Sequence, residues 1–216
     1  IEMVSPEFNQ MQVHNAIDLD FAAGVRTLMR QDPDIIMVGE IRDLETAQMA
    51  VQASLTGHLV LSTLHTNDAP SALTRLLDLG VPNYLIQSTL TGVVAQRLVR
   101  TLCPHCKSET TLDVRAWAAL THHWQLPVPS KSYGPKGCLE CRKTGFLGRT
   151  GIYEMMRISP PLRALIQPSM DLAKVGEVAL SEGMQPLRVS AAAHVASGIT
   201  TLKEVMHVLP PVEAAD

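Results

Sequence analysis

The sequence lacks any apolar run long enough to cross a lipid bilayer. Its first ten residues, IEMVSPEFNQ, have neither the basic start nor the apolar centre of a secretory signal peptide. It also lacks an excess of positive charge: the formal net charge is −3, which gives no support to nucleic-acid binding. The first two absences argue against a membrane-spanning or secreted protein. Together with the paired Cys-x-x-Cys motifs, which favour metal binding over disulfides, they predict a cytoplasmic location.

Internal repeats and low-complexity tracts are absent as well, and the chain does not begin with Met. The 216 residues are 46% hydrophobic and 18% charged, a composition typical of a globular protein. This length allows one large domain or two small ones. The missing initiator Met predicts that the sequence is a fragment of a longer protein.

The stretch DPDIIMVGEIRD contains the first functional signal. Its apolar residues run without alternation from Ile35 to Val38, which predicts a strand over residues 34–38 that is buried on both faces. Gly39 breaks the strand and Glu40 follows it. Because an unpaired buried carboxylate is costly, Glu40 is expected to have a partner.

Helices and strands are predicted to alternate along the first hundred residues. Asp20 and Asp43 are predicted to cap helices over 21–30 and 44–55, because a short polar side chain satisfies free N–H groups at a helix start. A second buried strand is predicted over 58–63, helices over about 70–80 and 82–100, and a weak strand at MQVHN. This order favours a parallel sheet with right-handed crossovers, and further strands are expected upstream of Ile1.

Polar residues follow both strong strands, where open α/β sheets bind their ligands. A hydrophobic strand that ends in an acid has the form of a Walker B element, whose acid lies beside a phosphate-bound Mg²⁺. The alternative is a structural strand with an acidic tip, and the short pattern fits both. His65, after the second strand, is either a structural hydrogen-bonding residue or a group that senses phosphate or orients water.

Four arginines allow two similar interpretations. Arg26 and Arg30 lie one helical turn apart, so they share a face of the first helix. These two, Arg42 and Arg149 are either solvated surface residues or guanidinium groups that neutralise phosphate charge.

The four cysteines form two Cys-x-x-Cys pairs within a loop-rich segment at residues 101–150. Cys103, Cys106, Cys138 and Cys141 together match the ligand set of a closed structural zinc site. The spacer between the pairs is longer than in common zinc ribbons, so it is expected to loop out. Free or redox-active thiols are the alternative, and nearby candidate ligands are His105, His122 and His123. After residue 160 we predict helices over 162–167, 172–181 and 200–208.

These elements together resemble the secretion ATPases that power type II secretion and type IV pilus assembly. The resemblance is carried by the segments FAAGVRTLMRQDPDIIMVGEIRDLETAQMAVQASLTGHLVLSTLHTNDAPSALTRLLDLG, VVAQRLVRTLCPHC, GCLECRKTGFLGRTGIYE and GMQPLR…GITTLKEV, which cover essentially the whole chain. The segments QASLTGHLVLSTLHTND and GVVAQRLVR resemble the type II secretion ATPases slightly more than the pilus-assembly ATPases.

The resemblance implies a role for each motif. IIMVGE matches the family's Walker B, with Gly39 and the acid Glu40, and TGHLVLSTLHT matches its histidine box, with His58 and His65. The cysteines match the zinc subdomain of the assembly ATPases. Glu2 matches the end of an aspartate box whose leading residues would precede Ile1. Positions that serve nucleotide contacts or subunit interfaces in the family correspond to Arg26, Arg30, Arg42 and Arg149.

The implied fold is α/β: a partial RecA-like P-loop NTPase core with an inserted zinc-binding subdomain and a C-terminal helical region. The implied domains are residues 1–100 for the core, 101–150 for the tetracysteine subdomain and 151–216 for the helical region. The intact protein is expected to use ATP, Mg²⁺ and structural Zn²⁺, and to form a hexamer on the cytoplasmic side of the inner membrane. Its expected partner is a membrane platform protein, with no nucleic acid.

One family motif is missing: no G-x-x-x-x-G-K-[ST] occurs in the 216 residues. We therefore expect residues 1–216 alone to be inactive as an ATPase. Pilus-assembly and DNA-uptake ATPases are alternatives to type II secretion. For the fragment itself, a non-catalytic, zinc-stapled docking module is the alternative from another functional class.

Overall fold

A computed structural model describes residues 1, 3–121 and 124–209. The chain forms two compact units, each made of separate stretches of sequence. The first contains residues 1–66, 70–91 and 158–175, and the second contains 67–69, 92–157 and 176–216. The functional boundaries at residues 100 and 150 stay a prediction.

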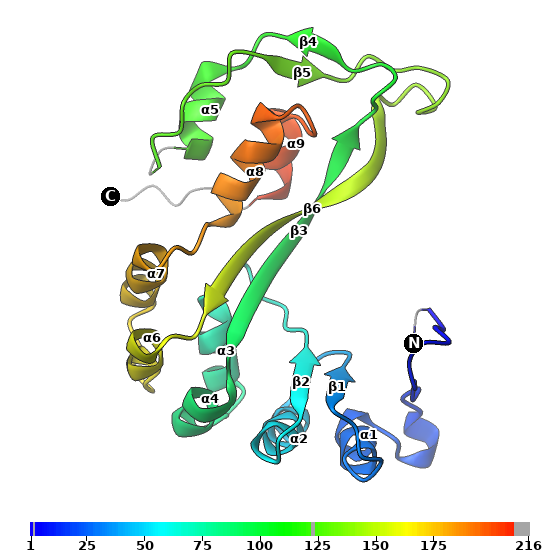
Figure 1. Cartoon of the computed structure of the whole chain (residues 1–216), viewed down its shortest axis with the longest axis vertical. Coiled ribbons are helices and arrows are strands. Elements are labelled where there is room, and N and C mark those ends of the chain that lie inside the picture. Colours follow the sequence, from blue (N-terminus) through cyan, green and yellow to red (C-terminus); the bar gives the residue numbers. More distant parts are fainter. Residues whose placement is uncertain (2, 122–123, 210–216) are drawn as a thin grey trace. The chain divides into compact units, whose positions relative to one another are not determined.

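The first unit is built on two parallel strands, as the sequence predicts. Strand β1 (Ile35–Val38) pairs with β2 (Leu59–Ser62), and the register runs from Ile35 opposite Leu59 to Val38 opposite Ser62. Helix α2 (Leu44–Leu55) makes the crossover, and α1 (Phe21–Leu28) lies beside it (Figure 1). Both strand ends that carry polar residues therefore meet at one edge of the sheet.

Both helices begin at the predicted capping residues. The side chain of Asp20 accepts a hydrogen bond from the Ala23 N–H at 2.7 Å, and that of Asp43 accepts one from Thr46 at 2.8 Å. Each cap contributes about 1 kcal/mol to helix stability. Asp43 thus starts the crossover helix three residues after Glu40.

Among the residues that the structure describes, helices cover the β1–β2 sheet on one face only. Ile36, Val38 and helix residues Val25 and Ala53 form its buried core. Ile35 and Met37 point the other way and are 58% and 69% exposed. The prediction of burial on both faces is therefore wrong for the described residues, because α1 and α2 pack against the same face of the two strands.

The remaining helices of the first unit are short. Side chains of Asn83 and Gln87 donate hydrogen bonds to the Ile166 carbonyl, at 3.4 and 2.8 Å, and so tie two of these helices together. The elements are η1 (Asn15–Ile17), α3 (Ser71–Asp78), α4 (Asn83–Thr89) and α6 (Pro160–Leu165), followed by α7 (Leu172–Ser181), whose residues are divided between the units. The weak strand expected at MQVHN is not among the described strands; His14 forms only an isolated bridge with Leu19.

The second unit is built on a long antiparallel pair, β3 (Gly92–Leu102) and β6 (Phe146–Arg157), which run side by side (Figure 1). The helix predicted over 82–100 is therefore wrong beyond Thr89. Within β3, Ala95 and Val99 are buried, and the residues between them are more exposed. The pairing register with β6 shifts before Leu102. Period-two burial and β-branched residues favour a strand, and Gly92 disfavours continuing the helix.

Two helices pack against this pair: α8 (Leu187–Ala196), which the sequence did not predict, and α9 (Leu202–Val208). The segment predicted to be loop-rich has some regular structure: β4 (Ser108–Thr110) pairs antiparallel with β5 (Ser132–Gly134), and α5 (Val114–Thr121) contacts α8 and α9. None of the helices in the described part of the chain is both long and apolar enough to span a membrane.

An ion pair between a buried carboxylate and an exposed arginine side chain fixes α9 to β3. Glu204 is 5% exposed and accepts hydrogen bonds from the Arg100 backbone N–H at 3.1 Å and from its Nε at 2.9 Å. Thr200 donates its hydroxyl to the Arg100 carbonyl at 2.8 Å. The Arg100 hydrogen bonds lower the pKa of Glu204 below its ordinary value of 4.5, although burial opposes this. The ionised carboxylate therefore stabilises the folded unit.

We predict that Glu204→Gln lowers the free energy of unfolding at pH 7 by about 1–2 kcal/mol, a value discounted for the exposed Arg100 side chain. Because the folded pKa is lowered, this contribution is full above pH 4.5 and is lost as the pH falls through the folded pKa. Urea unfolding at several pH values measures the difference. The exposed Glu177→Gln is the control, and a gap that stays constant down to pH 3 would contradict the assignment.

Candidate functional sites

The carboxyl ends of β1 and β2 are tied together directly. The Thr63 hydroxyl donates to the Gly39 carbonyl at 2.7 Å, and the Ile41 N–H donates to the Thr63 carbonyl at 3.0 Å. These two bonds continue the parallel pairing beyond the last strand residues. Glu40, between Gly39 and Ile41, is thereby held beside the segment that leads to His65.

Glu40 has the partners that its position requires. Its Oε2 lies 2.5 Å from Arg42 Nε and 3.4 Å from His65 Nε2. The Glu40 side chain is 21% exposed, whereas those of Arg42 and His65 are 71% and 83% exposed. The carboxylate is therefore sheltered while its two partners face solvent. Such an arrangement can hold a water molecule or a hydrated cation at the sheet edge.

Gly39 allows the chain to turn close to the core. A Cβ added there would lie 3.2 Å from Cε1 of the Phe21 ring, tighter than an ordinary van der Waals contact. Phe21 in turn packs on the core formed by Val25, Ile36 and Val38. A larger residue at position 39 would require this ring to shift slightly, so glycine suits the close packing of the turn that presents Glu40.

His58 lies at the other end of β2 from His65. Its Nδ1 is 2.9 Å from the Ala53 carbonyl and 3.1 Å from the Thr56 hydroxyl. Both partners belong to the last turn of α2 and its C-cap. The histidine thus fastens the helix end to the start of the strand, and the structure does not bring it to Glu40.

The other predicted residues are dispersed. Arg26 lies 3.8 Å from Glu45 across α1 and α2, with both side chains mostly exposed, and Arg30 is exposed. Arg149 is an exposed residue of β6 in the second unit, opposite Arg100. Glu2 lies outside the described residues. Sequence reasoning did not single out Thr63, although a hydroxyl residue at the end of an apolar strand is a usable signal.

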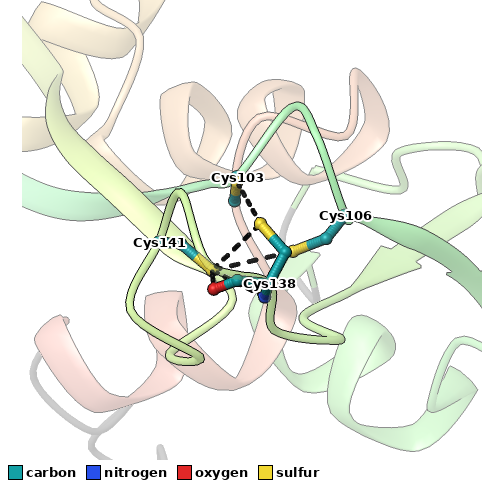
Figure 2. A group of neighbouring side chains, drawn as sticks. All are labelled: Cys103, Cys106, Cys138 and Cys141. Atoms are coloured by element: carbon teal, nitrogen blue, oxygen red, sulfur yellow. Dashed lines mark hydrogen bonds between the residues drawn. The ribbon is translucent and has the colours of Figure 1, made fainter.

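The four cysteines converge on one point. Cys103 and Cys106 follow β3, Cys138 and Cys141 precede β6, and Figure 2 shows their sulfur atoms turned towards one another. The Sγ atoms of Cys103 and Cys138 are 3.8 Å apart, as are those of Cys106 and Cys141, and all four lie within 4.8 Å of one another. His105 is not part of this group, and His122 and His123 lie outside the described residues.

These separations fit a tetrahedral metal centre. Four sulfurs placed about 2.3 Å from a zinc ion lie about 3.8 Å from one another. A disulfide requires about 2.05 Å between sulfurs, and all four thiols are free. Four thiolates also leave no open position for a substrate, so the site is suited to a structural metal ion rather than a catalytic one.

Backbone N–H groups point at the sulfurs. Gly145 donates to Cys141 Sγ at 3.1 Å, Cys138 donates to the same atom at 3.2 Å, and Gly137 donates to Cys106 Sγ at 3.3 Å. Burial raises the pKa of Cys103 to about 11 and also raises that of Cys106. Burial acts on Cys141 too, but the N–H groups of Cys138 and Gly145 lower its pKa to about 6. A central cation would favour the thiolate form of all four.

The loop before β6 depends on glycine. Gly145 has a φ of +76°, and a Cβ there would lie 2.3 Å from Cβ of Pro135. Its carbonyl accepts the Cys103 N–H at 2.9 Å, which links the two Cys-x-x-Cys pairs. The glycine therefore lets the second pair approach the first.

The fold agrees with solved ATPases. A crystal structure of the pilus retraction motor PilT with bound ADP matches at a TM-score of 0.59 and 26% identity, over 89% of this chain and 44% of that one. The Legionella pneumophila ATPase DotB matches at a TM-score of 0.63 and 24% identity, over 96% and 48%, and indicates the fold alone. One neighbour is a pilus motor solved with ADP and the other is named an ATPase, and this chain shares their α/β fold.

Sequence comparison then gives the family. The model for the type II/IV secretion system protein family matches residues 1–207, and the chain belongs to this family. The type IV pilus assembly ATPase TfpB of Acinetobacter baylyi is 57% identical over 97% of this chain. The type II secretion proteins HxcR of Pseudomonas aeruginosa and ATPase E of Vibrio cholerae are 48% and 46% identical, each over 96%. The chain spans only 36%, 40% and 41% of these three relatives.

We predict about one zinc ion per chain in freshly purified protein, and a melting temperature at least about 10 °C lower after chelation or in Cys138→Ser, because metal binding contributes directly to folding. Elemental analysis and thermal unfolding measure the two effects. Ser130→Ala, an exposed change in the same segment, is the control. Less than about half a zinc per chain would contradict the metal assignment.

Proposed function

We propose that this chain is part of an ATP-hydrolysing motor that drives assembly of a pilin-type filament. The observation that carries the proposal is the sheltered Glu40 carboxylate at the carboxyl end of β1, 3.4 Å from His65 at the end of β2. Family membership and the likeness to a motor whose structure contains ADP support a nucleotide as the ligand.

In this proposal Glu40 is the Walker B acid. Its carboxylate would face a metal-bound or attacking water, while His65 orients the carboxylate and senses the phosphate. Arg42 neutralises Glu40 in the structure and would be free to turn to phosphate when nucleotide binds. Mg²⁺, when bound, would neutralise charge that develops on the transferred phosphoryl group.

The residues present account for only part of such a site. Glu40 supplies one carboxylate, and the sequence holds no G-x-x-x-x-G-K-[ST] to cradle phosphates. We propose that these contacts come from a part of the whole protein outside this sequence, in a RecA-like core. Glu2, Arg26, Arg30, His58 and Arg149 would act at nucleotide contacts or subunit interfaces.

The machine served is either a type II secretion system or a type IV pilus. The segments QASLTGHLVLSTLHTND and GVVAQRLVR slightly favour type II secretion. Overall sequence identity favours the pilus relative, at 57% against 48% and 46% for the two type II relatives. Assembly of a pilus or of a pseudopilus is proposed in the two cases, so the proposal does not depend on the choice between them. The intact protein would act as a cytoplasmic hexamer against an inner-membrane platform protein, with residues 101–150 as a zinc-stapled subdomain.

The test is Mg²⁺-dependent ATP turnover by the full-length protein. Glu40→Gln should lower kcat about 10²-fold or more, because it removes a charge that acts in the transition state, with little change in melting temperature. Glu177→Gln, an exposed acid elsewhere, is the matched control. Residues 1–216 alone should show no turnover above their own Glu40→Gln variant. Unchanged kcat in full-length Glu40→Gln would overturn the proposal.

A further inference from the structure

The segment Asn67–Ala69 belongs to the second unit by its contacts, although the residues on both sides of it belong to the first. It begins two residues after His65. Whatever holds this segment therefore anchors the chain that begins two residues after the histidine. Two charged side chains of the β3–β6 pair hold it, and neither has a role in the function proposed above.

Glu154 of β6 is the first of these residues. It is 5% exposed, and its Oε1 accepts the Ala69 N–H at 2.8 Å. Its Oε2 accepts the N–H of Leu187, the first residue of α8, at 3.2 Å. One buried carboxylate thus joins the end of the segment to the start of a C-terminal helix.

Arg97 of β3 is the second. Its Nη2 donates to the Asn67 carbonyl at 2.9 Å. In the strand register Ala95 is opposite Glu154 and Arg97 is opposite Ile152, so Arg97 and Glu154 are diagonal neighbours on one face. They contact the two ends of the same three-residue segment, one as a donor and one as an acceptor.

The chemistry of this arrangement requires a carboxylate at position 154. Both of its oxygens accept from backbone N–H groups, and glutamine offers one acceptor and one NH₂ that would face a donor. Burial raises the pKa of Glu154, and the two N–H bonds oppose the rise. A buried acid is costly to keep if packing is its only role, since an apolar side chain would fill the space without desolvation.

We propose that Glu154 and Arg97 are positioning residues for Asn67–Ala69, the chain that follows His65, and that holding this segment is needed for ATP turnover. Both residues hold Asn67–Ala69, and Glu154 alone also joins this segment to α8 through the Leu187 N–H. This inference rests on the proposed function, because it assigns these residues a part in ATP turnover rather than in stability alone.

The experiment uses full-length protein and compares Glu154→Gln with Glu204→Gln. Glu204 is an equally buried glutamate of the same unit that also accepts a backbone N–H, but it does not contact Asn67–Ala69. We expect Glu154→Gln to lower kcat about 10-fold with the KM for ATP changed less than about twofold. Glu204→Gln, despite its lower stability, should keep kcat within about twofold.

Arg97 provides the second variant. Arg97→Met should lower kcat in the same way, and Arg97→Lys, which keeps a donor for the Asn67 carbonyl, should restore most of it. In residues 1–216, amide hydrogen exchange at Ala69 and Leu187 should accelerate in Glu154→Gln and not in Glu204→Gln.

The outcomes separate the two proposals. If the wild-type protein turns over ATP and kcat is unchanged in both Glu154→Gln and Arg97→Met, the positioning role is wrong and the proposed function still holds. Equal losses of kcat in Glu154→Gln and Glu204→Gln would show that Glu154 acts through the stability of the fold alone, and the positioning role would be wrong. Absence of turnover in the wild type would overturn the proposed function and the positioning role with it.

Discussion

The parallel pairing of β1 with β2 is the constraint on which the candidate site depends. Because both strands run in the same direction, residues that follow them meet at one edge of the sheet. The bond from Thr63 to the Gly39 carbonyl extends this pairing into the loops. Glu40 and His65, twenty-five positions apart in sequence, thereby become neighbours. A one-residue slip in register would separate them and would also turn Ile36 and Val38 out of the core.

In the second unit, the turn between α8 and α9 contacts several segments that are distant in sequence. The Ile199 carbonyl accepts the Leu102 N–H at 2.8 Å, next to the first metal-site cysteine. The Gly198 carbonyl accepts Lys107 Nζ at 2.8 Å, and the Tyr133 ring packs so closely that a Cβ at Gly198 would lie 2.5 Å from it. The tetracysteine cluster and the C-terminal helices are therefore one structure, which explains why residues distant in sequence form a single compact unit.

Local signals predicted the first unit well. The bounds of α1, α2, β1 and β2 were predicted almost to the residue from Asp20, Asp43 and the two apolar runs. The spacing of the Cys-x-x-Cys pairs predicted that the four cysteines lie together. Prediction failed where tertiary contacts decide. Residues 92–102 are a strand because β6 pairs with them, and the paired residues are 44 to 65 positions apart in sequence. The Glu40–His65 contact followed from topology, whereas the contacts of Glu154 with Ala69 and Leu187 link backbone groups that carry no sequence signature.

The central claim is that Glu40 and His65 act as one unit in ATP turnover. A double-mutant cycle of Glu40→Gln and His65→Ala on kcat of the full-length protein tests it most directly. The account predicts that the double variant is little slower than the slower single variant, because residues that act together lose their effect together. The departure from independence should be at least about fivefold. If the two reductions in kcat multiply, the two side chains act independently and the claim is wrong.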